Sequence, residues 1–499
     1  MANIKDFSNS LSRSIIYRKL ILISWFISLY LYFIVPEGMD TTFMSYILMN
    51  TIICSIIFLS YHKLIFKKIN LVSISYLFII GFFISHFQIA LTHVFGFEID
   101  SVYFQNYIWG NTKSGNLALT ISSLGLLSFY LGFSYGKIKK EIYRDYSRFI
   151  GRYKLITKVF TYLSYLFYIL FFITSGSYKY GNYGAGDGLG ISSYFAAIFN
   201  IFISSAIILK SFVLNKEIKN TKTIREYLVF FGKSLSLLVF WHILFSTYAG
   251  DRGPVIVFLI LYFGLYAIRV LNKKYTLVLI ICFFVFPIIL SILGASRSRT
   301  SKDSFSSRIG SSNYESRYSS NFSKDNVPGL STLELALSVR CVNHTIQNVP
   351  EKHDYRYGAY QLQQISSAVP FLSGFLKNEI INYEDYEDSS ADFVTFLIQG
   401  NKNTYGDGTT PVVDLYLDFG TFGVFLGFLI FGIFVKRADF TLFYGRSTTL
   451  FHWISIMFFL SGAMYLGRGT FLYYLQRIVQ MYLVIMVFNS FIGKRNVLK

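Results

Sequence analysis

Charged residues are scarce in this 499-residue sequence, where Asp, Glu, Lys and Arg together make up 15%. Soluble domains carry roughly 25% charged residues, and 53% of this chain is hydrophobic. These proportions exclude a water-soluble fold and indicate an integral membrane protein. Cysteine is also rare: Cys54, Cys282 and Cys341 lie far apart. This spacing excludes a disulfide framework or a cysteine-based metal cluster.

Acidic residues are outnumbered, 27 against 46 basic residues, which gives a net charge of +19. The basic residues are scattered in short connections between apolar runs, so they indicate membrane topology and contact with anionic lipid headgroups rather than nucleic-acid binding. The first apolar run is followed by Val35-Pro36-Glu37, not by a small-residue cleavage site. It is therefore expected to remain as a signal-anchor helix.

Apolar runs of membrane-spanning length recur along the chain, and a span requires about 20 such residues. The sequence predicts an all-α polytopic membrane helix bundle of about twelve transmembrane helices. The expected spans are 20–36, 42–61, 71–95, 115–135, 156–174, 191–212, 228–248, 254–271, 275–294, 411–435, 448–466 and 470–492. The Lys/Arg-rich connections then all fall on one side, so the positive-inside rule places both termini in the cytoplasm.

Three regions follow from this arrangement: spans one to nine in 1–294, one large outer-face loop in 295–410, and the last three spans in 411–499. The loop holds 116 residues, with 11 Lys/Arg and 13 Asp/Glu, and is far longer than ordinary connections. Apolar residues at helical spacing from Leu330 onward, and again over 358–376, predict short amphipathic helices. Such a loop is suited to closing over a substrate.

Several arginines break the topology bias and lie on the outer side or inside a span, which points to recognition of an anionic, diphosphate-bearing ligand. They are Arg252, Arg297, Arg299, Arg340, Arg468 and Arg477.

Arg252 and Arg468 lie in the small-residue turns Gly250-Asp251-Arg252-Gly253 and Gly467-Arg468-Gly469. Pro254 suits the first helical turn, so Arg252 is expected at a helix N-terminus, where exposed N–H groups favour an anion. The alternative is an interfacial arginine that reaches lipid phosphates.

Arg477 lies deeper, inside the last span, where an unpaired charge is costly. Asp414 and Asp418 are four residues apart on one helix face and are plausible structural partners. A ligand-binding role for Arg477 is the equal alternative.

Arg340 and His344 are also four residues apart, so they share a face of a predicted loop helix. A neutral histidine is a natural general base, and the neighbouring arginine can hold a phosphate. A structural role for a lone histidine is the competing interpretation.

Taken together, these features resemble the Wzy-type O-antigen or capsule oligosaccharide repeat-unit polymerase family. The likeness covers most of the chain in layout. It is sharpest at Gly250-Asp251-Arg252-Gly253, at Arg340 with Val349-Pro350 and 357–370, and at Tyr405-Gly406-Asp407-Gly408 with 414–420. The family tends to have serine at Thr410, glutamate at Asp414 and asparagine at Asp418. The shorter carboxylate leaves the role of position 414 open.

The resemblance implies a bacterial cytoplasmic-membrane glycosyltransferase with GT-C-like architecture that polymerises undecaprenyl-diphosphate-linked repeat units at the outer face. It implies that Arg252, Arg297, Arg340 and Arg468 hold the diphosphate, with His344 as the first-choice base and Asp414 as the second. No metal or other cofactor is expected. Membrane lipids are further partners, together with a chain-length regulator and a flippase, and nucleic acid is not one.

Three other classes of protein remain open at this point. An O-antigen ligase has similar topology and arginines but transfers glycan to lipid A core. A lipid-linked oligosaccharide flippase usually has short outer loops, unlike the segment 295–410. A polyprenyl-phosphate-dependent GT-C transferase needs paired carboxylates in an early outer loop, and Glu98 with Asp100 lies only in the second.

Overall fold

Helices make up nearly all the regular structure in the described part of the chain. The computed structural model describes residues 4–67, 70–110, 114–137, 147–176, 178, 190–217, 223–249, 251–270, 321–323, 332–369, 372, 388–401, 405–445 and 448–495. Within these residues the one non-helical pairing is an isolated β-bridge between Ile99 and Phe322. The chain is therefore an all-α polytopic membrane protein.

The helices that precede the large predicted loop are α1 (Ile4–Phe33), α2 (Thr41–Phe66), α3 (Ile74–Val94), α4 (Val102–Trp109), α5 (Gly115–Tyr135), α6 (Ser147–Thr174), α7 (Ile191–Glu217), α8 (Ile224–Phe231), α9 (Lys233–Ala249) and α10 (Arg252–Arg269). Within and after the loop lie α13 (Leu333–Ala336), α14 (Val339–Asn348), α15 (Ala359–Ser367), α17 (Ser390–Gln399), α18 (Pro411–Tyr444), α19 (Leu450–Gly462), the 3₁₀ helix η7 (Ala463–Arg468) and α20 (Leu475–Arg495).

Nine described helices are long and apolar enough to cross a membrane, and a bent pair raises the number to ten. The pair is α8 and α9, which meet at 101° within the predicted span 228–248. Gly232 lies at this bend with φ 89°, a left-handed conformation that favours glycine. The predicted span 254–271 is the shorter apolar helix Gly253–Arg269, and the predicted span 275–294 lies outside the described residues.

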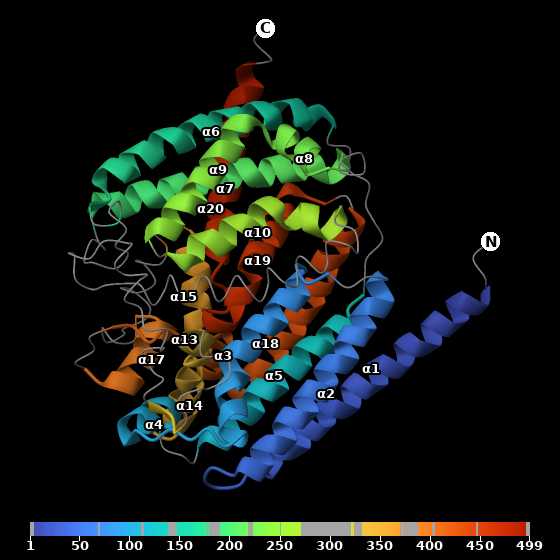
Figure 1. Cartoon of the computed structure of the whole chain (residues 1–499), viewed down its shortest axis with the longest axis vertical. Coiled ribbons are helices and arrows are strands. Elements are labelled where there is room, and N and C mark those ends of the chain that lie inside the picture. Colours follow the sequence, from blue (N-terminus) through green and yellow to red (C-terminus); the bar gives the residue numbers. More distant parts are fainter. Residues whose placement is uncertain are drawn as a thin grey trace.

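Two groups of helices form the bundle (Figure 1). In one, α1, α2, α3, α5 and α18 lie side by side; in the other, α6, α7, α9 and α10 lie beside α19 and α20. The α5–α18 crossing depends on Gly132 and Gly432, because a Cβ on either would overlap backbone of the other helix. Such small residues allow close helix contact in membranes. At one end of the first group lie α4, α14 and α17, and we name this the loop end.

α18 is broken near its start, where Phe419 and Gly420 leave the helical conformation. A Cβ added at Gly427 would lie 2.6 Å from the Leu415 side chain, although in a straight helix these residues would be about 18 Å apart. The segment Pro411–Asp418, named here the arm, therefore folds back beside the rest of α18. The predicted span 411–435 thus begins with this arm, and the continuous helix follows it.

Polar side chains also meet inside the opposite end of the bundle, about 28 Å along α18 from its break. There the Asp439 carboxylate accepts hydrogen bonds from the backbone N–H of Ile74 (3.0 Å) and the Ser75 hydroxyl (2.6 Å). Asp439 is fully buried. It supplies partners for the otherwise unpaired N–H groups at the start of α3, so α18 and α3 are joined at this end.

Candidate functional site

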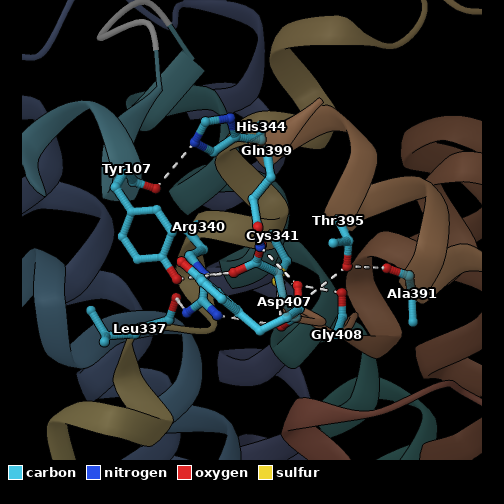
Figure 2. A network of polar contacts seen from close by, with 11 residues as sticks. Tyr107, Leu337, Arg340, Cys341, His344, Ala391, Thr395, Gln399, Asp407 and Gly408 are labelled. Atoms are coloured by element: carbon cyan, nitrogen blue, oxygen red, sulfur yellow. Dashed lines mark hydrogen bonds and ion pairs between the residues drawn. The ribbon is translucent and has the colours of Figure 1, made fainter. Parts of the chain in front are cut away.

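The helix α14 carries two predicted site residues, Arg340 and His344, and both face α4 at the loop end (Figure 2). The guanidinium carbon of Arg340 lies 4.9 Å from the centroid of the Tyr107 ring. Nε2 of His344 lies 3.1 Å from the Tyr107 carbonyl oxygen. The predicted shared helix face is therefore present, and Tyr107 packs against it.

Arg340 forms a buried ion pair with Asp407. Its Nε lies 2.7 Å from Asp407 Oδ1, and the two side chains are 7% and 0% exposed. A second guanidinium nitrogen donates to the Leu337 carbonyl at 2.7 Å. Much of the donor capacity of Arg340 is thus used within the protein, and the pair joins α14 to the segment that precedes α18.

Asp407 is held from three further directions (Figure 2). The Tyr107 hydroxyl donates to Oδ1 at 2.9 Å and the Gln399 amide donates to Oδ2 at 2.5 Å. The Asp407 backbone N–H donates to the Thr395 hydroxyl at 3.0 Å. A buried charge pair is tolerated when its remaining lone pairs are satisfied in this way. This network therefore fixes α4, α14 and α17 relative to one another.

The His344 ring lies against the C-terminal turn of α4. Because a carbonyl can only accept, Nε2 must donate its hydrogen to the Tyr107 carbonyl. Asn343 donates to the next carbonyl, that of Ile108, at 2.9 Å. Burial lowers the pKa of the His344 imidazole, and hydrogen bonds to the carbonyls of Tyr107 and Asn106 oppose that shift. The ring is therefore neutral near pH 7, as a general base requires.

Asp414 lies on the arm, fully buried, and connects four segments. Its Oδ1 accepts hydrogen bonds from the hydroxyls of Ser390 and Thr409. Its Oδ2 accepts from the Gln364 amide at 2.8 Å and from the Phe471 backbone N–H at 2.8 Å. These four donors fill the acceptor capacity of a carboxylate. Asp414 therefore ties α15, α17 and the chain after η7 to the arm.

Asp418, one turn further along the arm, accepts hydrogen bonds from the backbone N–H groups of Tyr360 (3.2 Å) and Gln361 (2.9 Å). Both N–H groups belong to the first turn of α15, where helix donors lack partners. The two carboxylates thus share a face, as the spacing predicts, and both bind α15. The arm and α15 form one unit.

Arg468 ends η7, and the chain just beyond it is fixed at two points. The Phe471 N–H donates to Asp414, and the Leu472 N–H donates to the Gln364 side-chain oxygen, each at 2.8 Å. The partly exposed Arg468 guanidinium makes no hydrogen bond to another described residue. A backbone held this firmly presents a cation that needs little reorganisation to bind an anion.

Cys341 lies next to Arg340 on α14, and its surroundings relate the ion pair to Arg468. Burial raises the pKa of the Cys341 thiol to about 11, and the positive charges of Arg340 and Arg468 act against this rise. The Cys341 thiol also contacts the Gly408 carbonyl at 3.7 Å. The next residue, Thr409, donates to Asp414, as the Phe471 N–H does. The chain after Arg468 is therefore linked through Asp414 to the segment that contacts α14. His344 and Arg340 thus lie at the loop end, whereas the Arg468 turn packs beside the middle of α3, where Gly467 lies against Phe82.

The remaining predicted arginines lie elsewhere or outside the description. Arg252 is the first residue of α10, with Pro254 in the same turn, but its side chain lies outside the described set, as does all of Arg297. Arg477 is exposed, and its guanidinium carbon lies 5.9 Å from the Tyr473 ring centroid. No ion pair joins it to Asp414 or Asp418 within the described residues, since those carboxylates accept neutral donors.

Sequence reasoning did not assign roles to four residues that organise this region, namely Tyr107, Gln364, Gln399 and Asp407. Asp407 did carry a signal, because the motif Tyr405-Gly406-Asp407-Gly408 is one of the places where the resemblance to the polymerase family is sharpest. The others are single polar residues in mixed segments, and their importance follows only from three-dimensional contacts.

The sequence profile of a family described as O-antigen polysaccharide polymerase Wzy matches residues 15–499. No curated protein and no solved structure matches the chain. The profile covers nearly the whole length, including every helix that contributes to the loop-end network. The chain therefore belongs to the O-antigen polysaccharide polymerase Wzy family, whose members act as glycosyltransferase-like polymerases on lipid-linked oligosaccharide repeat units in membranes.

Proposed function

We propose that this protein polymerises undecaprenyl-diphosphate-linked oligosaccharide repeat units into O-antigen or capsular polysaccharide. The reaction takes place at the outer face of the bacterial cytoplasmic membrane, with both termini in the cytoplasm and the segment 295–410 outside. The observation that carries the proposal is the Arg468 turn, a cation whose following backbone is fixed to the arm and to α15. Family membership supports the reaction class.

In the proposed reaction, a non-reducing-end hydroxyl of the acceptor repeat unit attacks the anomeric carbon of the donor glycan. A new glycosidic C–O bond forms as the bond from the anomeric carbon to the diphosphate oxygen breaks. The hydroxyl proton passes to a base on the protein, and undecaprenyl diphosphate leaves. Arg468, with Arg252 and Arg297, stabilises the negative charge that develops on this leaving group.

Arg340 and Arg477 belong to the same proposal in supporting roles. Arg340 is paired with Asp407, so its effect on the diphosphate is exerted at longer range, through its charge and through the framework it holds. Arg477 is exposed in the first turn of α20, a helix that contacts α15, and is proposed to contact the lipid-linked substrate from the membrane side.

The base is proposed to be His344, with Asp414 as the second choice. Nε2 of His344 donates to a backbone carbonyl, which leaves Nδ1 as the basic nitrogen of the neutral ring. All four acceptor positions of Asp414 are already used. The hydrogen bonds therefore favour His344.

The variant His344→Gln tests this assignment, because glutamine can still donate to the Tyr107 carbonyl but has no basic nitrogen. We expect the polymerisation rate to fall by about 10²–10⁴-fold, the usual range for a lost general base, without loss of folded protein. His353→Gln is the matched control, since His353 packs on Phe393 outside the network. A His344→Gln enzyme with wild-type rate would limit His344 to capping α4.

The function itself is tested by the surface-polysaccharide ladder of a deletion strain, with and without the plasmid-borne protein. We expect the ladder to collapse to a single repeat unit on its acceptor, and the plasmid to restore it. Polymer accumulating on its lipid carrier would instead show a ligase. Absence of any lipid-linked glycan outside would show a flippase.

The two proposed protein partners, a flippase and a chain-length regulator, are tested in the same strain. If a separate flippase and a chain-length regulator are partners, the plasmid should restore both the ladder and its normal length distribution. Restoration of polymer with an unregulated length would remove the chain-length regulator from the list of partners.

A further inference from the structure

His86 is a fully buried histidine in the C-terminal half of α3, and it contacts the Arg468 turn directly. Its Nε2 lies 3.1 Å from the Gly467 carbonyl oxygen, and its side chain is 0% exposed. Because the carbonyl only accepts, Nε2 carries the hydrogen and donates it. The hydrogen bond joins residues 381 positions apart and ends on the peptide unit directly before Arg468.

α3 and η7 lie in close contact where this hydrogen bond forms. A Cβ on Gly81 would overlap the Met464 carbonyl, and one on Gly467 would lie 3.0 Å from the Phe82 Cα. The Phe82 ring stacks on the imidazole, with centroids 4.1 Å apart. The ring is therefore fixed in both position and tilt, and its one hydrogen bond to the described part of the chain is directed at the turn.

We propose that His86 is a positioning residue that orients Arg468 toward the diphosphate leaving group, an inference that rests on the proposed role of Arg468. Asp414 and Gln364 fix the backbone after Arg468, at residues 471 and 472. His86 fixes the backbone before it, at residue 467. With both sides held, the guanidinium projects from a rigid turn; without His86, the Gly467 carbonyl loses this hydrogen bond and its orientation is less tightly defined.

This arrangement predicts an effect on the rate rather than on substrate affinity. A displacement of about 1 Å at a group that acts on the transition state lowers the rate by up to roughly 100-fold. His86 does not contact substrate in this proposal, and it acts only through the Gly467 carbonyl. Its loss should therefore lower kcat while KM changes little.

The test compares His86→Leu and His86→Gln in purified, reconstituted protein that extends a defined lipid-linked repeat unit. We expect kcat to fall about 10–100-fold in His86→Leu and to recover in large part in His86→Gln, whose amide N–H can replace Nε2–H. His242→Leu is the matched control. His242 is also buried, at 4% exposure, but packs on Phe199 and Phe258 in the other helix group.

A double-mutant cycle with Arg468→Ala separates this inference from the proposed function. If His86 acts through Arg468, His86→Leu lowers kcat no further once Arg468 is alanine. An equal loss in both backgrounds would overturn the positioning role and leave the function of Arg468 intact. Wild-type activity in Arg468→Ala alone would instead overturn the proposed role of Arg468.

A folding defect is distinguished by thermal unfolding of the same preparations. If His86→Leu does not fold, His86→Asn replaces it, because the shorter amide cannot reach the Gly467 carbonyl. At equal unfolding midpoints, low kcat in His86→Asn together with high kcat in His86→Gln supports the proposal. Equal kcat in these two variants would overturn it.

Discussion

Asp407→Ala is expected to lower the free energy of unfolding by about 3–5 kcal/mol and to abolish the polysaccharide ladder. The change leaves the buried guanidinium of Arg340 without its carboxylate partner. It also removes the acceptor of the Tyr107 hydroxyl and the Gln399 amide. Since these contacts join α4, α14 and α17, the whole loop-end network is affected. Thermal unfolding of the detergent-purified protein, beside the ladder, measures both effects.

The control is Asp354→Ala, which removes an exposed carboxylate from the same loop segment and should leave both readouts unchanged. An unfolding midpoint equal to wild type in Asp407→Ala would contradict the structural role of the pair. The double variant Arg340→Met/Asp407→Leu adds a second distinction, because replacing both charges with apolar groups often restores stability. A stable but inactive double variant would assign Arg340 a direct part in the reaction.

Arg468→Ala is expected to lower kcat/KM by about 10²–10³-fold, the usual cost of removing one donor that stabilises transition-state charge. Stability should change little, because the guanidinium forms no hydrogen bond to another described residue. Arg468→Lys should recover only part of the activity, since lysine keeps the charge but loses the planar, two-pronged donor set. Steady-state kinetics with a defined lipid-linked repeat unit measure these values.

Arg225→Ala provides the control, because Arg225 is an exposed arginine on α8, away from the loop end. Its activity should equal that of wild type. Full activity of Arg468→Ala would show that another cation, such as Arg252, serves the leaving group. Full activity of Arg468→Lys beside an inactive alanine variant would show that charge alone is sufficient.

The positions of the membrane helices were largely predictable, because they follow from local runs of apolar residues. The span 115–135 coincides with α5, and the predicted amphipathic stretches contain α14 and α15. Spacing also placed Arg340 with His344 on one helix face. Each of these inferences depends on residues within a few turns of one another, where helical periodicity is a reliable guide.

The break in α18 and the partners of the site residues could not be predicted in the same way. A hydropathy average does not detect the break, because Phe419 and Gly420 both fit the composition of an apolar helix. Tyr107 and Asp407 are 300 residues apart, and Asp414 and Phe471 are 57 apart. The sequence offered an Asp–Arg pair for Asp414 as one of two equal alternatives, whereas tertiary packing supplies four neutral donors.

The join between Asp439 and the start of α3 has a consequence for biosynthesis. The Ile74 N–H and its acceptor are 365 residues apart, so the acceptor does not exist when α3 leaves the ribosome. At about 5–20 residues per second, translating the interval takes on the order of 20–70 s. During this time α3 lies in the membrane without the Asp439 acceptor at its start. Completion of the bundle therefore waits for the last three long helices. A nascent chain that stalls before α18 keeps the Ser73 cap on the Tyr76 N–H but leaves the Ile74 N–H and the Ser75 hydroxyl without the Asp439 carboxylate.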